Sequence, residues 1–207
     1  PDYGCTHRNH EVEPPLFDIQ EEFLPAQGRN LATITYPQMR IMADYSNIKQ
    51  GTTEFKNYVE DELMPAVIDY FQAAFKIKQP TTGLLKFGTS TKTICGYTTP
   101  TKLYSGVSTD YFLVVSSTSD SNSNWVASAG ACYLASGTKR PIVGSILFNL
   151  YYTKAAKGDP LVHEKNMYLT MHEMLHALGF SGSSFRNFID ANGKTLTGHI
   201  KSVVLDG

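Results

Sequence analysis

The sequence predicts one layered α/β domain, and three observations along the chain support it. A stripe of large apolar side chains at helical spacing runs through Thr52–Lys78. Three apolar, strand-like segments follow at 111–115, 125–133 and 141–149. A second helix-compatible segment then carries His172-Glu173-Met174-Leu175-His176. Helix, strands and helix in this order favour a single core, and 207 residues are enough to bury one.

Residues 1–30 are expected to form an arm, similar to a pro-segment, that lies on the domain made by residues 31–207. Pro14, Pro15 and Gly28 interrupt any regular element in this stretch. The first regular element after the arm is expected at Met39–Ala43, where apolar and polar residues alternate as in a strand.

The helix predicted over Thr52–Lys78 is amphipathic and begins at a capping residue. Thr52 or Thr53 is a suitable N-cap. Pro65 lies inside the pattern, so we expect it to kink the helix or to divide it in two. The apolar stripe is interpreted as core, and its positions are four residues apart: Phe55, Val59, Leu63, Val67, Phe71 and Phe75.

Polar segments separate or follow the remaining elements. Ser116–Asn124 is rich in Ser, Asn and Asp and is expected to be a flexible turn between two strands. After the second helix, Ser181–Ser184 is expected to be a loop and Phe185–Ile189 a short helix. Asp190–Lys194 carries a strong turn signal.

Charge and cysteine content narrow the class of protein. Eighteen Lys and Arg residues against 19 Asp and Glu give a formal charge of -1 without a basic stripe, which argues against nucleic acid as a partner. The apolar runs are too short to cross a bilayer. Cys5, Cys95 and Cys132 make an odd count: Cys95 and Cys132 could pair, but all three could also be reduced and buried.

The pair His172 and His176 predicts a zinc site. Residues four apart on a helix lie on the same face, so both imidazoles can reach one Zn²⁺ ion. Glu173 is then placed to accept a proton from a water that the metal activates. Gly179 stands where the chain must turn sharply after the second ligand. The alternative is an ordinary amphipathic helix with two surface histidines and a glycine cap.

The segment His172–Ser181 closely resembles the leishmanolysin family of metzincin peptidases. Upstream segments follow in the family's order and extend the resemblance over most of residues 35–190: Arg40–Ser46, Cys95-Gly96, Tyr111–Ser117, Ala129–Cys132 and Arg140–Asn149. The resemblance implies a twisted mixed sheet packed on two long helices, of which the second carries the zinc motif. It also implies a disulfide between Cys95 and Cys132.

The resemblance further implies a latent precursor that a cysteine of the pro-segment keeps inactive. Cys5-Thr6-His7 is similar to this Cys-x-His switch, although Tyr3 and Arg8 stand where the family usually has His and Asp. A thiolate is a good zinc ligand and would close the site. Alternatively, Cys5 is a disulfide partner or an idle thiol.

The third metal ligand departs from the usual metzincin pattern. Metzincins ordinarily place it six residues after the second histidine, where this chain has Gly182. Leishmanolysins bring it from much further on, followed by Trp; His199 is followed by Ile200 and is not assigned this role. We expect the third histidine and the Met-turn beyond Gly207, so residues 31–207 would be the incomplete, zinc-helix part of a catalytic domain.

The other histidines are not expected to bind the metal. His163 is interpreted as a surface or capping residue. His7 and His10 are interpreted as solvated, with the reservation that His7 belongs to the switch-like segment around Cys5.

These features together predict a zinc endopeptidase of leishmanolysin type, secreted or on the cell surface. Its partners would be protein or peptide substrates, lying extended along an edge strand at Trp125–Cys132. Any membrane attachment would come from an anchor outside this sequence. The alternative is an inactive adhesion or structural protein that keeps the peptidase fold.

Overall fold

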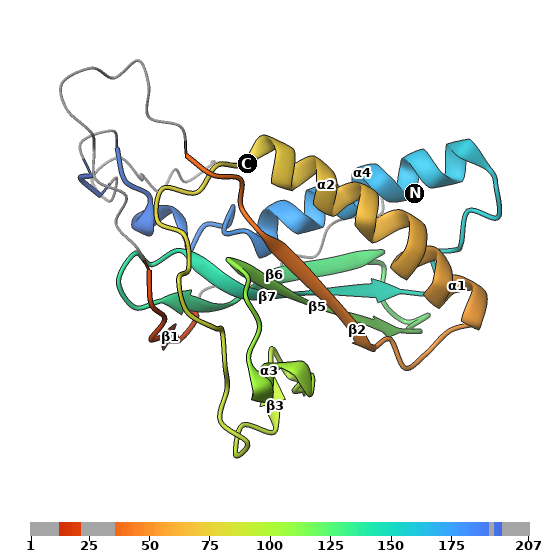
Figure 1. The fold of residues 1–207 in the computed structure, drawn as a ribbon. Coiled ribbons are helices and arrows are strands. Elements are labelled where there is room, and N and C mark those ends of the chain that lie inside the picture. The colour runs from red at the N-terminus through yellow and green to blue at the C-terminus, as the bar shows by residue number, and fades with distance from the viewer. Residues whose placement is uncertain (1–12, 22–35, 191–192, 196–207) are drawn as a thin grey trace, which may run out of the picture.

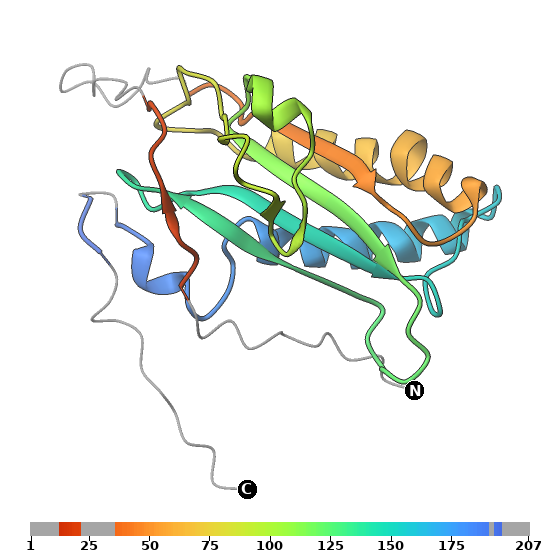
Figure 2. The same cartoon turned by 90° about the horizontal axis from the view of Figure 1, so that it is seen from below.

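The computed structural model describes residues 13–21, 36–190 and 193–195 and forms one mixed α/β unit (Figure 1). Two helical segments lie side by side on one face of a five-stranded sheet. The opposite face carries a small hairpin and a short helix, as the view from below also shows (Figure 2). This is the layered α/β arrangement that the sequence predicts.

The sheet is mixed, with strand order β1-β6-β7-β5-β2. Strands β2, β5 and β7 are parallel to one another, whereas β6 is antiparallel to β7. The strands are β1 (Leu16–Phe17), β2 (Ile41–Asn47), β5 (Tyr111–Thr118), β6 (Ala127–Ala135) and β7 (Pro141–Asn149). β6 therefore forms one side of the sheet, and the short β1 pairs in parallel with its last two residues.

Strand pairing moves several of the predicted boundaries. Ser116–Thr118, predicted as part of a turn, continues β5 because each residue pairs with β7, Ser116 with Leu147 for example. The first predicted strand is displaced to Ile41–Asn47, and its start pairs with Tyr111. Within the arm, for which the sequence predicts only irregular structure, β1 forms against β6.

The first helix is continuous and passes Pro65 through a π-helical turn. Helices α1 (Thr53–Asn57) and α2 (Met64–Ala74) flank this turn, Tyr58–Leu63. Thr52 caps the start, since its side chain accepts a hydrogen bond from Phe55 N at 3.1 Å. The wider turn accommodates a proline, which has no N–H and whose ring crowds the preceding turn. Instead of the expected kink or division at Pro65, the helix stays continuous and changes from α to π at Tyr58–Leu63.

The end of this helix differs from the prediction. Phe75–Ile77 is extended rather than helical and Lys78 lies in a bend, because the backbone of Phe75–Ile77 bonds instead to residues just before β2. Met39 N donates to Phe75 O, and Ile77 N donates to Pro37 O. A tertiary pairing has overridden the local helical pattern.

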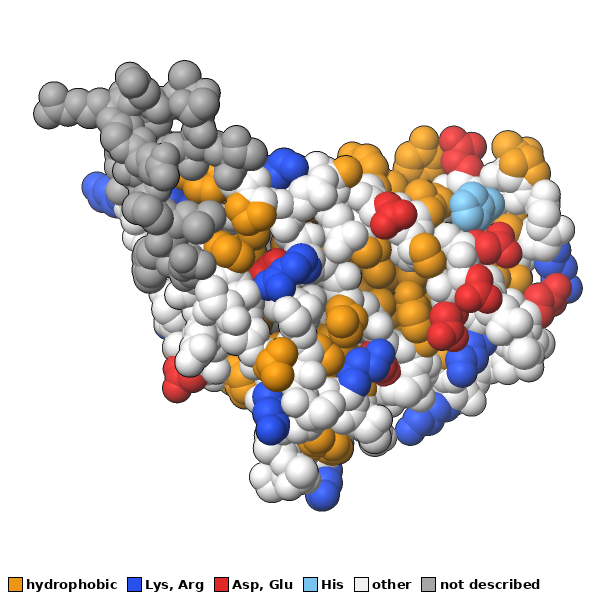
Figure 3. All heavy atoms as spheres, in the orientation of Figure 1, with side chains coloured by type: hydrophobic (Ala, Val, Ile, Leu, Met, Phe, Trp, Pro, Cys, Tyr) orange, Lys and Arg blue, Asp and Glu red, His pale blue; other side chains and the backbone are white. Residues whose placement is uncertain are grey.

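Acidic side chains cover the outer side of the first helix. Glu54, Glu60, Asp61 and Glu62 are exposed there, and Figure 3 shows acidic groups gathering over this end of the molecule. Tyr45 is mostly buried nearby, and its burial, together with the charges of Glu60 and Asp61, raises the pKa of its hydroxyl to about 12. The charged side of the helix thus faces outward while its apolar stripe packs in the core.

The second long helix, α4, spans Pro160–Ala177 and contains the histidine motif. Its start follows a local signal that the sequence analysis missed: Asp159 accepts hydrogen bonds from Leu161 N and Val162 N, and Pro160 occupies the first turn. Its inner side buries residues at helical spacing against β6 and β7: Asn166, Thr170, Glu173, Met174 and Ala177.

Tyr111 fixes the end of α4 to the sheet. Its fully buried hydroxyl donates to Ala177 O at 2.7 Å. Burial raises the pKa of Tyr111, so the hydroxyl keeps its proton and remains a donor. Gly144 makes room for this contact, since a Cβ there would lie 1.9 Å from the Tyr111 hydroxyl. A buried hydrogen bond thus joins the end of the helix to the sheet, in addition to the apolar packing of Met174 and Ala177.

The remaining elements are short. They are β3 (Thr93–Ile94), β4 (Tyr97–Thr98), α3 (Lys102–Ser105) and a 3-10 turn at Phe185–Asn187, shorter than the predicted helix. The structure contains the disulfide expected between Cys95 and Cys132, with Cα atoms 5.3 Å apart. This bond joins the β3–β4 hairpin to strand β6. Hydrogen bonds between Asp190 and Lys194 accompany the turn expected there.

Candidate metal centre

His172 and His176 present their Nε2 atoms to each other near the end of α4. The two atoms are 3.2 Å apart, and the rings lie nearly perpendicular at 83°. A tetrahedral zinc ion with Zn–N bonds of 2.0–2.1 Å requires about 3.3 Å between two ligand nitrogens. The spacing therefore fits two ligands of one zinc ion. His172 is exposed and His176 half-buried, so the pair is accessible from solvent.

The ring of His176 is held by the backbone that follows the helix. Its Nδ1 lies 2.8 Å from Phe180 O. A carbonyl can only accept, so Nδ1 carries the proton, and in this tautomer Nε2 is the nitrogen whose lone pair could bind a metal. This outer hydrogen bond gives His176 both the orientation and the tautomer of a ligand.

Gly179 makes this hydrogen bond possible by turning the chain back over the helix. Gly179 N donates to His176 O at 3.1 Å and Phe180 N to Leu175 O at 3.0 Å, which is the Schellman arrangement of a helix end. The turn needs φ = +100° at Gly179, and a Cβ there would lie 2.9 Å from Pro141 Cγ. The sharp turn expected at Gly179 is confirmed, for both a conformational and a steric reason.

Glu173 lies beside the histidine pair, on the buried flank of α4. It is only 1% exposed, and it packs where α4 meets the sheet. Consecutive helical residues point about 100° apart, so Glu173 adjoins the site without sharing the face of the two histidines. A carboxylate with little access to bulk water beside two nitrogen ligands is a suitable proton acceptor for a hydrolytic reaction.

A family model described as leishmanolysin matches residues 47–200, which is most of the chain. The chain belongs to the leishmanolysin family. This is a family of metallopeptidases, so the histidine pair lies in a chain whose relatives use a metal for hydrolysis.

A mouse relative matches this leishmanolysin-family chain over a shorter stretch. The ciliated left-right organizer metallopeptidase of Mus musculus is 38% identical over 65 residues. The match covers 31% of this chain and 9% of the mouse protein, so the chain spans only a small part of that relative's length.

Other residues singled out in the sequence lie elsewhere in this leishmanolysin-family fold. Cys5, His7, His10 and His199 are outside the described residues. His163 is half-buried, with Nδ1 3.1 Å from the Tyr58 hydroxyl, so it links α4 to the π-helical turn. This corrects its interpretation as a surface or capping residue. Asn166 Nδ2 also donates to the Tyr58 hydroxyl, at 3.1 Å.

The described part of the chain brings two histidine nitrogens together and adds no further candidate ligand to them. Among its residues no group of three or more His, Cys, Asp or Glu side chains gathers in a metal-binding arrangement. Nor does it include a helix of the length and apolarity needed to cross a membrane. Within these described ranges the two histidines are therefore the side chains of the predicted motif whose spacing suits a shared metal ion.

Strand β6 has an outer edge that, in the described part of the chain, is paired only near its end. The sequence predicts it at Trp125–Cys132, and it forms at Ala127–Ala135. Within the described ranges, only β1 pairs with its outer side, at Leu134 and Ala135. The edge is joined to the end of α4 through β7, since Leu134 pairs with Pro141, against which Gly179 packs.

Proposed function

We propose that this chain forms the zinc-helix part of a metzincin-type zinc endopeptidase, secreted or displayed on the cell surface. The observation that carries the proposal is the 3.2 Å spacing of the His172 and His176 Nε2 atoms in a leishmanolysin-family chain. The disulfide between Cys95 and Cys132 is consistent with an oxidising, extracellular setting.

In this proposal His172 and His176 hold Zn²⁺ through Nε2, and a third ligand comes from outside the described residues. Zinc, when bound, supplies Lewis acidity to the scissile carbonyl and lowers the pKa of water at the site. Glu173 takes the proton of the attacking water and returns it to the leaving amine. The carbonyl of Phe180 keeps the His176 ring in the ligating tautomer throughout.

Protein or peptide substrates would bind in an extended conformation along the outer edge of β6. Unpaired N–H and C=O groups of an edge strand recognise an extended chain regardless of its side chains. The edge from Ala127 to Tyr133 has no strand partner among the described residues and so is available for this role.

We further propose that the arm is a pro-segment, with Cys5 as its metal-blocking residue. The described part of the arm supports this, because it pairs with the same side of β6, directly after the segment that a substrate would use. Leu134 N donates to Pro15 O and Ser136 N donates to Phe17 O, both at 3.0 Å. The arm runs parallel to β6.

The decisive experiment compares Glu173→Gln with the wild type in the full-length protein, after activation. The variant should still bind zinc, since both histidines remain, but its cleavage of a protein substrate should fall by at least about a hundredfold. Glu164→Gln is the matched control, because Glu164 is exposed on the same helix. A chelator should abolish the wild-type activity and zinc should restore it.

Equal cleavage by wild type and Glu173→Gln would refute the assigned role. A full-length protein that binds no zinc and cleaves nothing would instead support the alternative, an inactive adhesion or structural protein with this fold.

A further inference from the structure

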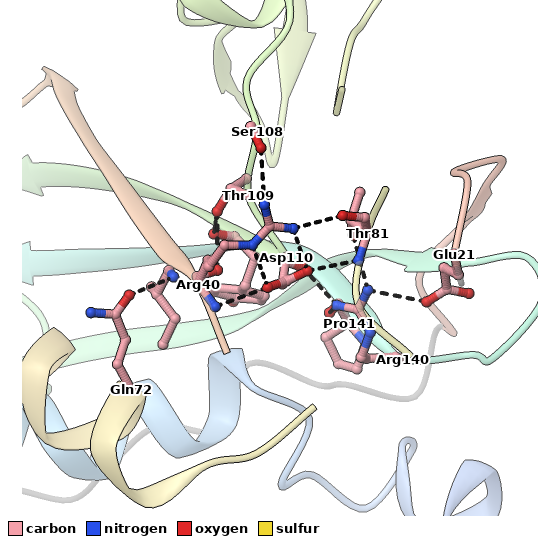
Figure 4. Close-up of polar contacts among 11 residues, drawn as sticks. Glu21, Arg40, Gln72, Thr81, Ser108, Thr109, Asp110, Arg140 and Pro141 are labelled. Atoms are coloured by element: carbon pink, nitrogen blue, oxygen red, sulfur yellow. Dashed lines mark hydrogen bonds and ion pairs between the residues drawn. The ribbon is translucent and has the colours of Figure 1, made fainter. Parts of the chain in front are cut away.

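An ionic network with buried carboxylates lies where β2, β5 and β7 begin (Figure 4). Arg40 contacts Asp110 through two side-chain hydrogen bonds of 2.9 and 2.8 Å. Asp110 also accepts from the backbone N–H groups of Arg40 and Thr81. Burial acts to raise the pKa of Asp110, but these hydrogen bonds outweigh it and hold the pKa below its ordinary value. Arg40 and Asp110 therefore form a complete ion pair within the domain.

The second guanidinium of the network, Arg140, takes its counter-charge from the arm. Arg140 Nη1 donates to two neutral carbonyls, Asp110 O at 2.6 Å and Pro141 O at 3.2 Å. Its Nη2 contacts Glu21 Oε1 at 3.0 Å. Within the described part of the chain, Glu21 is the carboxylate in direct contact with Arg140. Without Glu21, two guanidinium groups would share the single carboxylate of Asp110.

The donors that hold Glu21 all belong to the domain and are fixed independently of the arm. Thr138 donates to Glu21 Oε1 at 3.0 Å, and its hydroxyl also accepts from Arg140 N, so its position is set by its own hairpin. Arg140 is held by the two carbonyl oxygens already described. The Glu21 side chain is only 6% exposed in this corner, and Figure 4 shows it reaching Arg140 from a separate segment.

A largely buried Arg140 guanidinium without a carboxylate partner would destabilise the folded domain. Its side chain is 17% exposed, and burial lowers the pKa of its guanidinium while the charges of Glu21 and Asp110 oppose this. A buried cation that loses its partner favours binding of another anion. Thr138 and Arg140 also line a cavity of about 900 Å³, through which a ligand can approach the corner.

We propose that Thr138 and Arg140 form a subsite for an acidic side chain of a bound peptide, which Glu21 occupies in this chain. The subsite rests on the proposed function, since it becomes available only when the arm leaves the domain. An acidic residue of a protein substrate is then its expected occupant, because a paired hydroxyl and guanidinium select a carboxylate over a neutral side chain.

The test measures peptide binding rather than cleavage. A negative result for the subsite can therefore be told apart from a lack of peptidase activity. Full-length protein carrying Glu173→Gln receives a specific protease site between Gly28 and Arg29, is cut there, and is separated from its arm. Labelled peptides with the sequence of residues 13–21 are titrated onto it. A Glu21→Gln peptide should bind roughly tenfold to a hundredfold more weakly than the natural one. A peptide with Asp18→Asn is the control, since Asp18 is exposed and should not matter.

Substitutions in the domain show which of its residues cause the difference in peptide affinity. Arg140→Met should remove the difference in affinity between the natural and the Glu21→Gln peptides, and Lys139→Met, a neighbouring loss of charge, should keep it. If Arg140→Met fails to fold, Thr138→Val serves instead and should reduce the difference. Equal binding of the natural and Glu21→Gln peptides to the unaltered domain overturns the subsite. Unfolding of the domain whenever the arm is removed also overturns it, because Glu21 would then be a permanent structural residue.

Discussion

Gly179→Ala tests how the helix end supports the histidine pair. The glycine has φ = +100°, a conformation that alanine adopts only with strain, and an added Cβ would lie 2.9 Å from Pro141 Cγ. The two effects are separable in this chain. Gly158 also has a positive φ, +81°, but nothing within 4 Å of an added Cβ, and Gly182 has neither feature.

The expected loss of stability in Gly179→Ala is the sum of the conformational strain and the steric clash with Pro141. The left-handed conformation costs a non-glycine residue roughly 1–2 kcal/mol. Forcing a methyl group against Pro141 adds about 1–2 kcal/mol, since the ring and the strand behind it are packed. Gly179→Ala should therefore lower the free energy of unfolding by about 2–4 kcal/mol and the Tm by on the order of 10 °C. Gly158→Ala should show only the conformational part, and Gly182→Ala almost no change.

The zinc affinity of Gly179→Ala is the second quantity to measure, after its stability. If the turn moves, Phe180 O no longer holds His176 Nδ1, and loss of such an outer hydrogen bond weakens metal binding roughly tenfold to a hundredfold. Thermal unfolding and competition with a chromophoric chelator, both on the full-length protein, give the two values. Gly179→Ala that is no less stable than Gly158→Ala, or that binds zinc as tightly as the wild type, would refute the reasoning.

Two further predictions concern charge and latency. Asp110→Asn should lower the free energy of unfolding by about 2–3 kcal/mol at neutral pH, because Arg40 loses a charged acceptor; since the folded-state pKa of Asp110 is lowered, the difference from wild type should be full above about pH 4 and disappear as the pH falls through that lower value. Urea unfolding at a series of pH values measures this, and a pH-independent difference would contradict it. Cys5→Ala should raise the peptidase activity of the uncleaved full-length precursor, and unchanged activity would leave the arm a packing element only.

Sequence patterns predicted the parts of this protein that depend on neighbours close in the chain. The i, i+4 spacing brings His172 and His176 together on any regular helix, and the glycine after the helix marks its turn. The paired cysteines required more: their proximity depends on the fold, and it was the family resemblance that indicated it.

The features that were missed depend on partners far along the chain. Phe75–Ile77 continues the helical sequence pattern, yet its backbone is extended because it pairs with residues just before β2. Ser116–Thr118 is polar, yet β7 provides a complete set of partners. The contact of His163 with Tyr58 joins positions 105 residues apart, and no local pattern encodes it. The start of α4 is the exception, because Asp159-Pro160 is a local signal that could have been recognised.

The hydrogen bond from Tyr111 to Ala177 bears on the order in which a metal site is assembled. It connects the histidine-bearing end of α4 to the start of β5, so the same cooperative event that folds the sheet also orders the two histidines of the proposed zinc site. The entropy of aligning them is then lost during folding rather than during metal uptake. In the proposed zinc site, a metal arriving afterwards would meet two preorganised imidazoles, and only the third ligand would have to be recruited. Metal loading would thus report on completion of the rest of the protein, not on formation of this unit.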